Sequence, residues 1–235
     1  SYQSHYLTGN KKKKYVISRD QSFHGSTTGA LTLGDRKNTI FYSKNFNLKR
    51  VKIPMHHPLY LKRKNENLNE YAKRSAKSLE EAILKIGPKN VGAFVGETIM
   101  GGLVGDVPPA PNYWKYISKI CNKYNVHLIL DEVYCGTGSS GKYFCFDWDK
   151  IRPDFVFIGK TLAAGYGALS AVITTKKIEK ILKSSGRLQH NTTYQGHSLS
   201  AAAALEVQKI VNKKSFLDNV NSIGKFMREN LIKEL

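Results

Sequence analysis

Three apolar runs of strand length constrain the fold of this chain more than any other feature. The runs are VGAFVGE (91–97), VHLILDE (126–132) and DFVFIG (154–159). Each run is apolar on both faces, which is typical of strands in a parallel sheet that helices cover on both sides. Helical patterns separate the runs. We therefore predict an α/β fold with a mostly parallel sheet and helices on both faces.

The remaining elements follow from apolar spacing and from likely caps and breakers. A short strand is expected at 14–19, and helices are expected at 67–88, 111–125, 175–185, 199–213 and 216–235. Asn112 is expected to cap the second of these helices. The longest irregular stretch, 45–66, is expected to lie over the carboxyl edge of the sheet, where functional loops gather.

One connection departs from the parallel pattern. Only about ten residues separate Lys160 from the strand-like segment 171–175, which is too few for a parallel crossover with its own helix. We therefore predict that strand 171–175 runs antiparallel to its neighbour.

Charge and cysteine content limit the function classes. The formal net charge is +19, but the lysines are scattered along every predicted helix and no RNA-recognition signature is present, so we expect no nucleic-acid partner. No apolar run reaches membrane-spanning length, and the polar N-terminal residues do not resemble a secretory signal. Three cysteines without a zinc-ligand spacing predict a reduced, cytoplasmic protein without a metal site.

Charged side chains stand where the predicted strands end. Glu97 ends the first run, Asp131 and Glu132 end the second, and Lys160 follows the third. The carboxyl ends of parallel strands form the ligand crevice of an open sheet, and neighbouring strands lie about 5 Å apart. A buried Asp131–Lys160 ion pair would be a weak structural choice. The functional alternative is a lysine that forms a Schiff base with pyridoxal 5′-phosphate (PLP), beside a carboxylate that keeps the cofactor's ring nitrogen protonated.

Five ordered blocks resemble one family over nearly the whole chain. The chain is similar to the class III pyridoxal-phosphate-dependent aminotransferases, and its last block is most similar to the ω-amino acid transaminase branch. The blocks are SFHGSTTGA, FVGETIMGGLVGDVPP, LILDEVYCGTGSSGKYFCFD, PDFVFIGKTLAAGYGALSAV and QHNTTYQGHSLSAAAALEVQ. The resemblance implies the aspartate aminotransferase-like fold type I. Residues 1–235 would form its PLP-binding large domain, with the family's start and its C-terminal small domain missing from this chain.

The resemblance also implies a function and two catalytic residues. The reaction would be PLP-dependent transfer of an amino group from an amino acid or amine to a keto acid, often pyruvate, in a cytoplasmic homodimer with composite active sites. Lys160 would form the Schiff base and then move a proton. Asp131 would pair with the pyridinium nitrogen.

Further roles are carried over to individual positions. Val133 and Phe23 would flank the cofactor ring, and His24 belongs to the cofactor-binding aromatic-His-Gly segment. Thr193 would reach the cofactor phosphate of the partner subunit, and Glu97 would line the substrate side. We assign no acid–base role to His24, His56 or His57, because histidines in polar loops are usually solvated.

Two departures from the family pattern concern substrate choice. The segment GSSG (138–141) replaces a usual Gly-Arg-Thr-Gly, and Tyr134 replaces a frequent glutamine. Two alternatives stay open. A PLP-dependent aminomutase of the same family would use the same residues without a second keto acid. A non-catalytic basic binding protein on this scaffold would show salt-sensitive affinity for nucleic acid.

Overall fold

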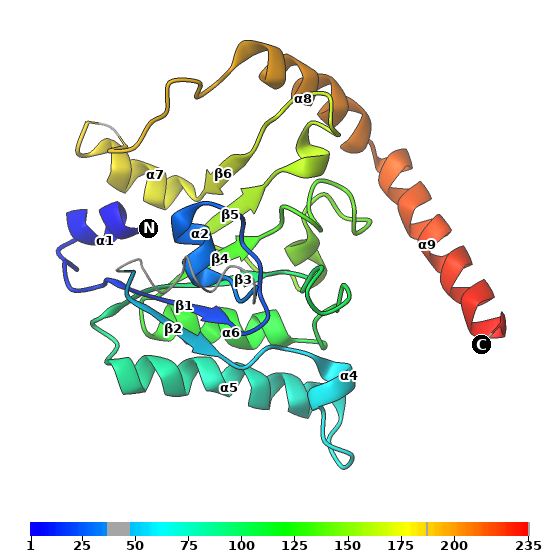
Figure 1. The fold of residues 1–235 in the computed structure, drawn as a ribbon, viewed down its shortest axis with the longest axis horizontal. Coiled ribbons are helices and arrows are strands. Elements are labelled where there is room, and N and C mark those ends of the chain that lie inside the picture. The colour runs from blue at the N-terminus through cyan, green and yellow to red at the C-terminus, as the bar shows by residue number, and fades with distance from the viewer. Residues whose placement is uncertain (37–47, 187, 235) are drawn as a thin grey trace.

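The protein is built around one six-stranded sheet (Figure 1). The computed structural model describes residues 1–36, 48–186 and 188–234. The strand order is β2-β1-β3-β4-β5-β6, and every neighbouring pair is parallel except β5 and β6. The predicted sheet and its antiparallel last strand are therefore confirmed. The strands are β1 (Tyr15–Arg19), β2 (Arg50–Ile53), β3 (Val91–Glu97), β4 (His127–Asp131), β5 (Phe155–Ile158) and β6 (Ala171–Thr174).

All five predicted helices are present, with ends that differ by a few residues. They are α5 (Leu68–Ile86), α6 (Tyr113–Lys123), α7 (Lys176–Lys183), α8 (Ser198–Val211) and α9 (Lys214–Glu234). Three short helices and two 3₁₀ turns were not predicted, because segments of three to six residues carry too little periodicity. These are α1 (Tyr2–Leu7), α2 (Thr28–Leu33), α4 (Pro58–Leu61), η2 (Cys145–Trp148) and η3 (Lys160–Leu162).

Helices cover both faces of the sheet. The larger core lies under α5 and α6, where Trp114 and Ile117 of α6 pack with Phe94 of β3. On the other face, Val95 of β3 packs in a smaller cluster with Ile178 of α7. Figure 1 shows α5 and α6 on one side of the sheet and α1, α2 and α7 on the other. Successive side chains of β3 point to opposite faces of the sheet, so this strand contributes to both cores, as expected for a strand buried on both faces.

The prediction that the Asn112 side chain caps α6 is wrong. Asn112 does occupy the N-cap position, but its side chain caps no backbone N–H. Its φ is +67°, whereas a capping residue usually has an extended backbone. The side chain instead donates to Asn69 Oδ1 at 2.9 Å and accepts from Lys115 Nζ at 2.9 Å.

Segment 45–66 is not irregular where the structure describes it. Residues 45–47 lie outside the described residues, and the rest contains edge strand β2 and helix α4. The charged residues of RVKI (50–53) interrupt the apolar pattern of a strand, but all four residues pair with β1. Because β2 is parallel to β1, the residues after Ile53 do start at the carboxyl edge, as predicted.

The histidines of this segment are buried rather than solvated, so that expectation is wrong. His56 stacks on Tyr113 with ring centroids 3.7 Å apart, and its Nε2 accepts from the Ala110 N–H at 2.9 Å. Burial lowers the pKa of His56 to about 2. His57 is 2 % exposed. Both histidines hold the loop onto the core and lie away from the strand-end cavity described below.

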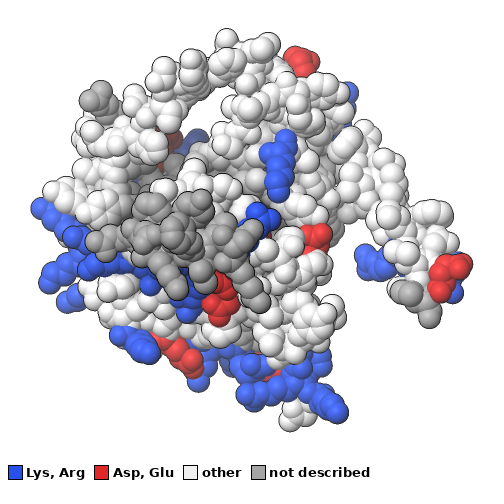
Figure 2. Space-filling model, in the orientation of Figure 1, with Lys and Arg blue, Asp and Glu red and all other residues white. Residues whose placement is uncertain are grey.

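Basic residues are spread over the surface. Figure 2 shows Lys and Arg along the lower part of one face, over α4 and α5, with acidic residues among them. This mixed distribution agrees with the scattered lysines of the sequence. None of the described helices combines the length and the hydropathy that a membrane crossing needs.

The two last helices lie off the sheet. Figure 1 shows α9 projecting away from the body of the molecule, and none of its described residues is buried. The loop after β4 packs closely against the end of α8. A Cβ added at Gly138 would lie only 2.6 Å from the Val211 side chain, so the two segments touch at this glycine. Apolar side chains of α9 are exposed, including Phe226, Met227, Leu231 and Ile232.

Candidate active site

A cavity lies at the carboxyl edge of the sheet, between the loops that follow β1, β3, β4 and β5. Its volume is about 330 Å³. From β1 the chain crosses to β2 on one side, and β3 pairs with β1 on the other side, so the strand order reverses here. Ligands of open parallel sheets bind at such a point. The cavity is lined by Phe23, His24, Gly25, Ser26, Arg36, Glu97, Gly101, Gly102, Leu103, Asp131, Val133, Tyr134 and Lys160.

Asp131 forms the floor of this cavity. It is the last residue of β4 and is 7 % exposed. Its Oδ2 lies 2.9 Å from His24 Nδ1, and its Oδ1 accepts from the Val133 N–H at 3.1 Å. These two hydrogen bonds fix the orientation of the carboxylate. His24 Nε2 is buried and has no hydrogen-bond partner among the described residues, which favours a ligand group beside it.

Glu97 ties two cavity loops together. It lies beside Asp131 in the register of β3 and β4. Its Oε2 accepts from the Phe23 N–H at 3.3 Å, and its Oε1 accepts from the Gly101 N–H at 3.2 Å. Burial raises the pKa of Glu97, against the opposing charge of Arg19. The predicted substrate-side residue therefore lines the cavity, with both carboxylate oxygens engaged by backbone N–H groups.

Lys160 stands at the mouth of the cavity and is exposed rather than buried in an ion pair with Asp131. The reason is that β5 ends at Ile158 and the chain turns into η3. Within the described residues no ion pair joins Lys160 to Asp131. The ammonium lies over the Tyr134 ring at 5.1 Å from its centroid, a favourable cation–π contact. Lys160 has a left-handed φ of +45°.

Phe23 and Val133 reach the same cavity from different loops. Both are half-buried. The Arg36 guanidinium lies over the Phe23 ring at 4.9 Å, and Val133 packs against the backbone at Gly159. The structure therefore brings together all the predicted cavity residues from four strand ends.

Thr193 is the exception among the predicted residues. It is exposed in the segment between α7 and α8 and does not line the cavity. Because the structure holds one chain, the contact of Thr193 with the cofactor of a partner subunit stays a prediction.

Two residues near the site were missed by sequence reasoning. Arg19 ends β1, is 1 % exposed and lies over the Trp114 ring at 5.3 Å. It donates to the backbone carbonyl of Glu97 and so braces the floor. Arg19 is a charged residue at the end of a strand, as Glu97 and Asp131 are, so the same sequence criterion could have identified it. Asp106 accepts from the Tyr134 hydroxyl at 3.1 Å, and no signal within the β3–α6 loop indicates this contact.

Glu132 anchors the next layer below the cavity. It is fully buried and accepts from the Thr98 hydroxyl at 2.9 Å and from the N–H groups of Cys145 and Phe146 at 2.8 Å each. Burial is the main cause that raises its pKa to about 7. Through these bonds the end of β4 is fixed to η2 and to the end of β3.

Comparisons with known proteins agree with this arrangement. Residues 2–235 match the family described as Aminotransferase class-III. A taurine–pyruvate aminotransferase of Rhodobacter capsulatus is 36 % identical over 97 % of this chain and 50 % of its own length. A gamma aminobutyrate transaminase 2 of Solanum lycopersicum is 36 % identical over 95 % of this chain and 49 % of its own length.

Solved structures show the same fold. An omega transaminase from Pseudomonas jessenii in complex with PMP has a TM-score of 0.90 and 29 % identity, covering 99 % of this chain and 52 % of that one. A transaminase with L-ala has a TM-score of 0.91 and 27 % identity, covering 99 % of this chain and 55 % of that one. The chain spans about half the length of the curated relatives it matches.

Proposed function

Because this chain belongs to the class-III aminotransferase family, we propose that it forms the cofactor-binding part of an enzyme that transfers an amino group from an amino acid or amine to a keto acid. One observation carries the proposal: the Asp131 carboxylate and the Lys160 amine lie on the floor and at the mouth of one cavity. A nucleophilic amine and a buried carboxylate are the groups that PLP chemistry needs from a protein.

The residues of the cavity fit PLP as the proposed cofactor. When bound, PLP supplies an aldehyde that reacts with amines and a cationic ring that withdraws electrons. The cavity volume of about 330 Å³ is within the range of small-molecule sites. The unpartnered Nε2 of His24 marks a buried polar group that a ligand would satisfy. Phe23 and Val133 supply apolar walls between the floor and the mouth.

Asp131 would hold the protonated ring nitrogen. An isolated buried carboxylate is costly, so it needs a cationic or hydrogen-bonding partner. His24 and the Val133 N–H already fix the Asp131 carboxylate by hydrogen bonds, and it still faces the cavity. A carboxylate so fixed stabilises a ring N–H⁺ without reorganising during the reaction.

Lys160 would act as the nucleophile and as the group that moves the proton. Lys160 is exposed, and its Nζ lies over the Tyr134 ring. A flexible amine of this kind would hold the cofactor through its aldehyde and would accept and return the proton of the substrate carbon. The Tyr134–Asp106 hydrogen bond orients the ring under the ammonium. Tyr134 is thus a positioning residue.

The relatives' names guide the proposal for substrates. Two of them are named as aminotransferases of taurine or of gamma aminobutyrate, and one of these names includes pyruvate. We infer that this protein accepts an amine distant from its acid group and transfers the amino group to a small keto acid such as pyruvate. The amide-bound carboxylate of Glu97 would contribute to the cavity shape on this side.

A homodimer in the cytoplasm completes the proposal. Thr193 is exposed and outside the cavity of its own chain, which supports a contact with the cofactor phosphate of a second subunit. Three free cysteines support a reducing compartment.

Borohydride trapping tests the function. The complete protein is incubated with PLP, reduced with borohydride, digested and mapped by mass spectrometry. The expected result is one PLP-modified peptide, which contains Lys160. In a separate assay, the intact protein with PLP and without borohydride should produce alanine from taurine and pyruvate or from gamma aminobutyrate and pyruvate. Modification of other lysines, with Lys160 unmodified, would overturn the assignment. Isomerisation of an amino acid without any keto acid would instead indicate the aminomutase.

A further inference from the structure

Two cysteines form a buried pair outside the candidate active site. Cys135 is 3 % exposed and Cys145 is 5 % exposed. Their sulfur atoms and a carboxylate oxygen of Glu132 all lie within 4.8 Å of one another. Cys135 directly follows Tyr134, which lines the active-site cavity, and Cys145 begins η2. The pair thus joins an active-site loop to a separate structural element.

The cluster is poorly arranged for a metal ion. Both oxygens of Glu132 already accept hydrogen bonds, from the Thr98 hydroxyl and from the N–H groups of Cys145 and Phe146. A metal would have to break these buried bonds, at a cost for each N–H left unpaired. Glu132 therefore acts as a hydrogen-bond acceptor for neighbouring groups, and the two sulfur atoms remain close to each other without a metal ligand between them.

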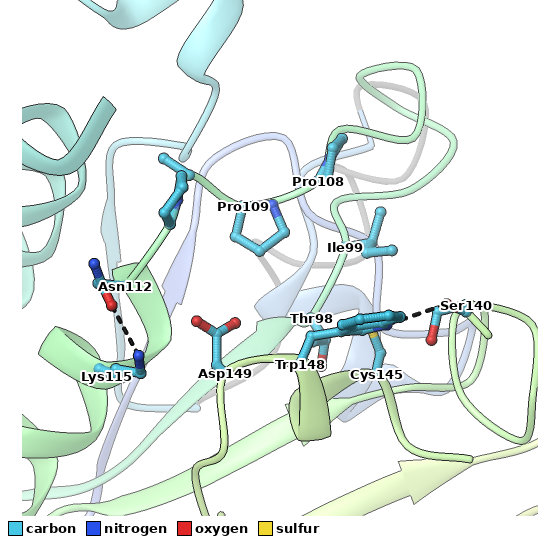
Figure 3. A pocket seen from close by; sticks show the side chains of 12 residues that line it. Thr98, Ile99, Pro108, Pro109, Asn112, Lys115, Ser140, Cys145, Trp148 and Asp149 are labelled. Carbon is cyan, nitrogen blue, oxygen red and sulfur yellow. Dashed lines mark hydrogen bonds between the residues drawn. The ribbon is translucent and has the colours of Figure 1, made fainter. Parts of the chain in front are cut away.

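A second cavity is lined by one of the two cysteines. Its volume is about 480 Å³, and Cys145 lines it together with Thr98 and Trp148 (Figure 3). Figure 3 shows these three residues on one wall, facing Ile99 and Pro108 across the cavity. Cys135 does not line this cavity. A small solute entering from solvent therefore meets Cys145 first and finds Cys135 behind it.

The two cysteines also differ in their surroundings. A hydrogen bond between the two side chains raises the pKa of the Cys135 thiol, and burial adds to this effect. Cys145 lines the cavity and Cys135 does not, so the arrangement favours Cys145 as the residue that reacts first with a solute.

We propose that Cys145 and Cys135 form a peroxide-sensitive dithiol that closes into a disulfide within the chain. The Cys145 thiolate attacks a hydroperoxide, breaks the O–O bond and becomes a sulfenic acid, while the alkoxide or hydroxide leaves and takes up a proton. The Cys135 sulfur then attacks the Cys145 sulfur, and water leaves with the Cys135 proton. In sum, two thiols and one hydroperoxide give one disulfide, one alcohol or water, and one further water.

The proposed bond would have a defined structural effect. A disulfide brings its sulfurs to about 2 Å, so the two side chains must rotate toward each other from their present separation. The bond would fix the loop that carries Tyr134 to the start of η2. The same loop carries Val133 and directly follows Asp131, so oxidation would change the position of residues that line the active-site cavity.

Thiol titration after peroxide treatment tests the proposal. The complete protein is reduced, freed of reductant and treated with one equivalent of hydrogen peroxide. We expect the thiols of Cys135 and Cys145 to disappear while that of Cys121 remains, and a peptide pair joined between Cys135 and Cys145 to appear, lighter by two hydrogens. Dithiothreitol should restore both thiols. Cys121→Ala is the matched control, because Cys121 is buried elsewhere in the core and this variant should still lose two thiols.

Single variants assign the two roles. Cys135→Ala should accumulate a sulfenic acid at Cys145 that dimedone traps, and Cys145→Ala should keep the Cys135 thiol intact. Circular dichroism checks that both variants are folded before oxidation. Trapping at Cys135 in the Cys145→Ala variant, or disulfides only between chains, would overturn the proposal. One equivalent of tightly bound zinc that protects both thiols would also overturn it and would make the cluster a metal site.

Discussion

The floor and the rim of the candidate active site are built differently. On the floor, Asp131 is 7 % exposed, and Glu132 directly below it is fully buried; each carboxylate accepts two or more hydrogen bonds. On the rim, Lys160 is exposed, and its amine lies over the face of the Tyr134 ring. Asp131 and Lys160 stand at the ends of the neighbouring strands β4 and β5.

The difference shows which side chains are oriented by folding alone and which need a bound ligand to be oriented. Buried hydrogen bonds hold the floor carboxylates in place whether or not a cofactor is present. An exposed lysine side chain keeps most of its rotamer freedom until a covalent or ionic partner restrains it. Substitutions on the rim should therefore change chemistry without changing stability, whereas the floor should show both effects.

Lys160→Arg is the strongest test of the rim. We expect turnover to fall below detection, since arginine keeps the positive charge but cannot serve as the nucleophilic amine. Some PLP binding should remain, and the melting temperature should change by less than about 2 °C, because an exposed substitution costs little. Steady-state assays beside a thermal melt give both values. Measurable turnover in this variant would remove Lys160 from the mechanism.

Asp131→Asn asks whether the floor serves the chemistry. Asparagine keeps the size and can still accept from His24, but it lacks the negative charge that holds a ring N–H⁺. We expect the first half-reaction to slow by about a hundredfold or more, as for other groups that stabilise developing charge, with a smaller effect on the melt. Stopped-flow absorbance with a single amine donor measures this rate. A normal rate in a destabilised protein would make Asp131 purely structural.

Glu132 gives the floor a pH signature. Its pKa is about 7 in the folded chain and 4.5 as the ordinary value, so the folded state binds more protons between these limits. The free energy of unfolding should therefore fall as pH rises from about 4.5 to 7, by at most ~3 kcal/mol, and level off above 7.

Urea unfolding at several pH values, compared with Glu132→Gln, measures this effect. Groups that titrate in both proteins cancel in the difference between the two curves. A difference that does not change with pH would mean that Glu132 stays ionised in the fold.

Thr193→Ala has the smallest expected effect and tests the proposed contact with the partner subunit's cofactor. Loss of one hydrogen bond to a phosphate is worth ~1.5 kcal/mol or more, which corresponds to about tenfold weaker PLP retention. The fold should not change, because Thr193 is exposed. Equilibrium dialysis of PLP gives the affinity, and sedimentation gives the oligomeric state. An active monomer with unchanged PLP affinity would contradict the composite site.

The sequence predicted the floor better than the rim for a physical reason. The apolar runs placed Glu97 and Asp131 correctly, because a strand buried on both faces continues to the last apolar residue. The same reasoning placed Lys160 at the correct strand end but did not predict its exposure, since β5 stops at Ile158 and the chain turns into η3. Exposure after a strand end depends on the turn, which periodicity does not report.

Contacts between distant residues were beyond sequence reasoning for a different reason. The hydrogen bond between His24 and Asp131 joins residues 107 positions apart, and the loop after β1 carries no periodic pattern. The resemblance placed His24 near the cofactor but not against the Asp131 carboxylate. Likewise, the partners of Glu132 come from η2, a 3₁₀ turn of four residues that leaves no signal in the sequence.

The left-handed backbone of Lys160 has an evolutionary meaning. A side chain with a Cβ at φ +45° costs ~1–3 kcal/mol relative to a relaxed residue, and glycine would adopt this conformation without that cost. Random substitution should thus find variants that are more stable and inert at position 160. A screen of this protein for thermostability alone would reward the loss of its amine, so any directed evolution of the scaffold has to select for turnover at the same time.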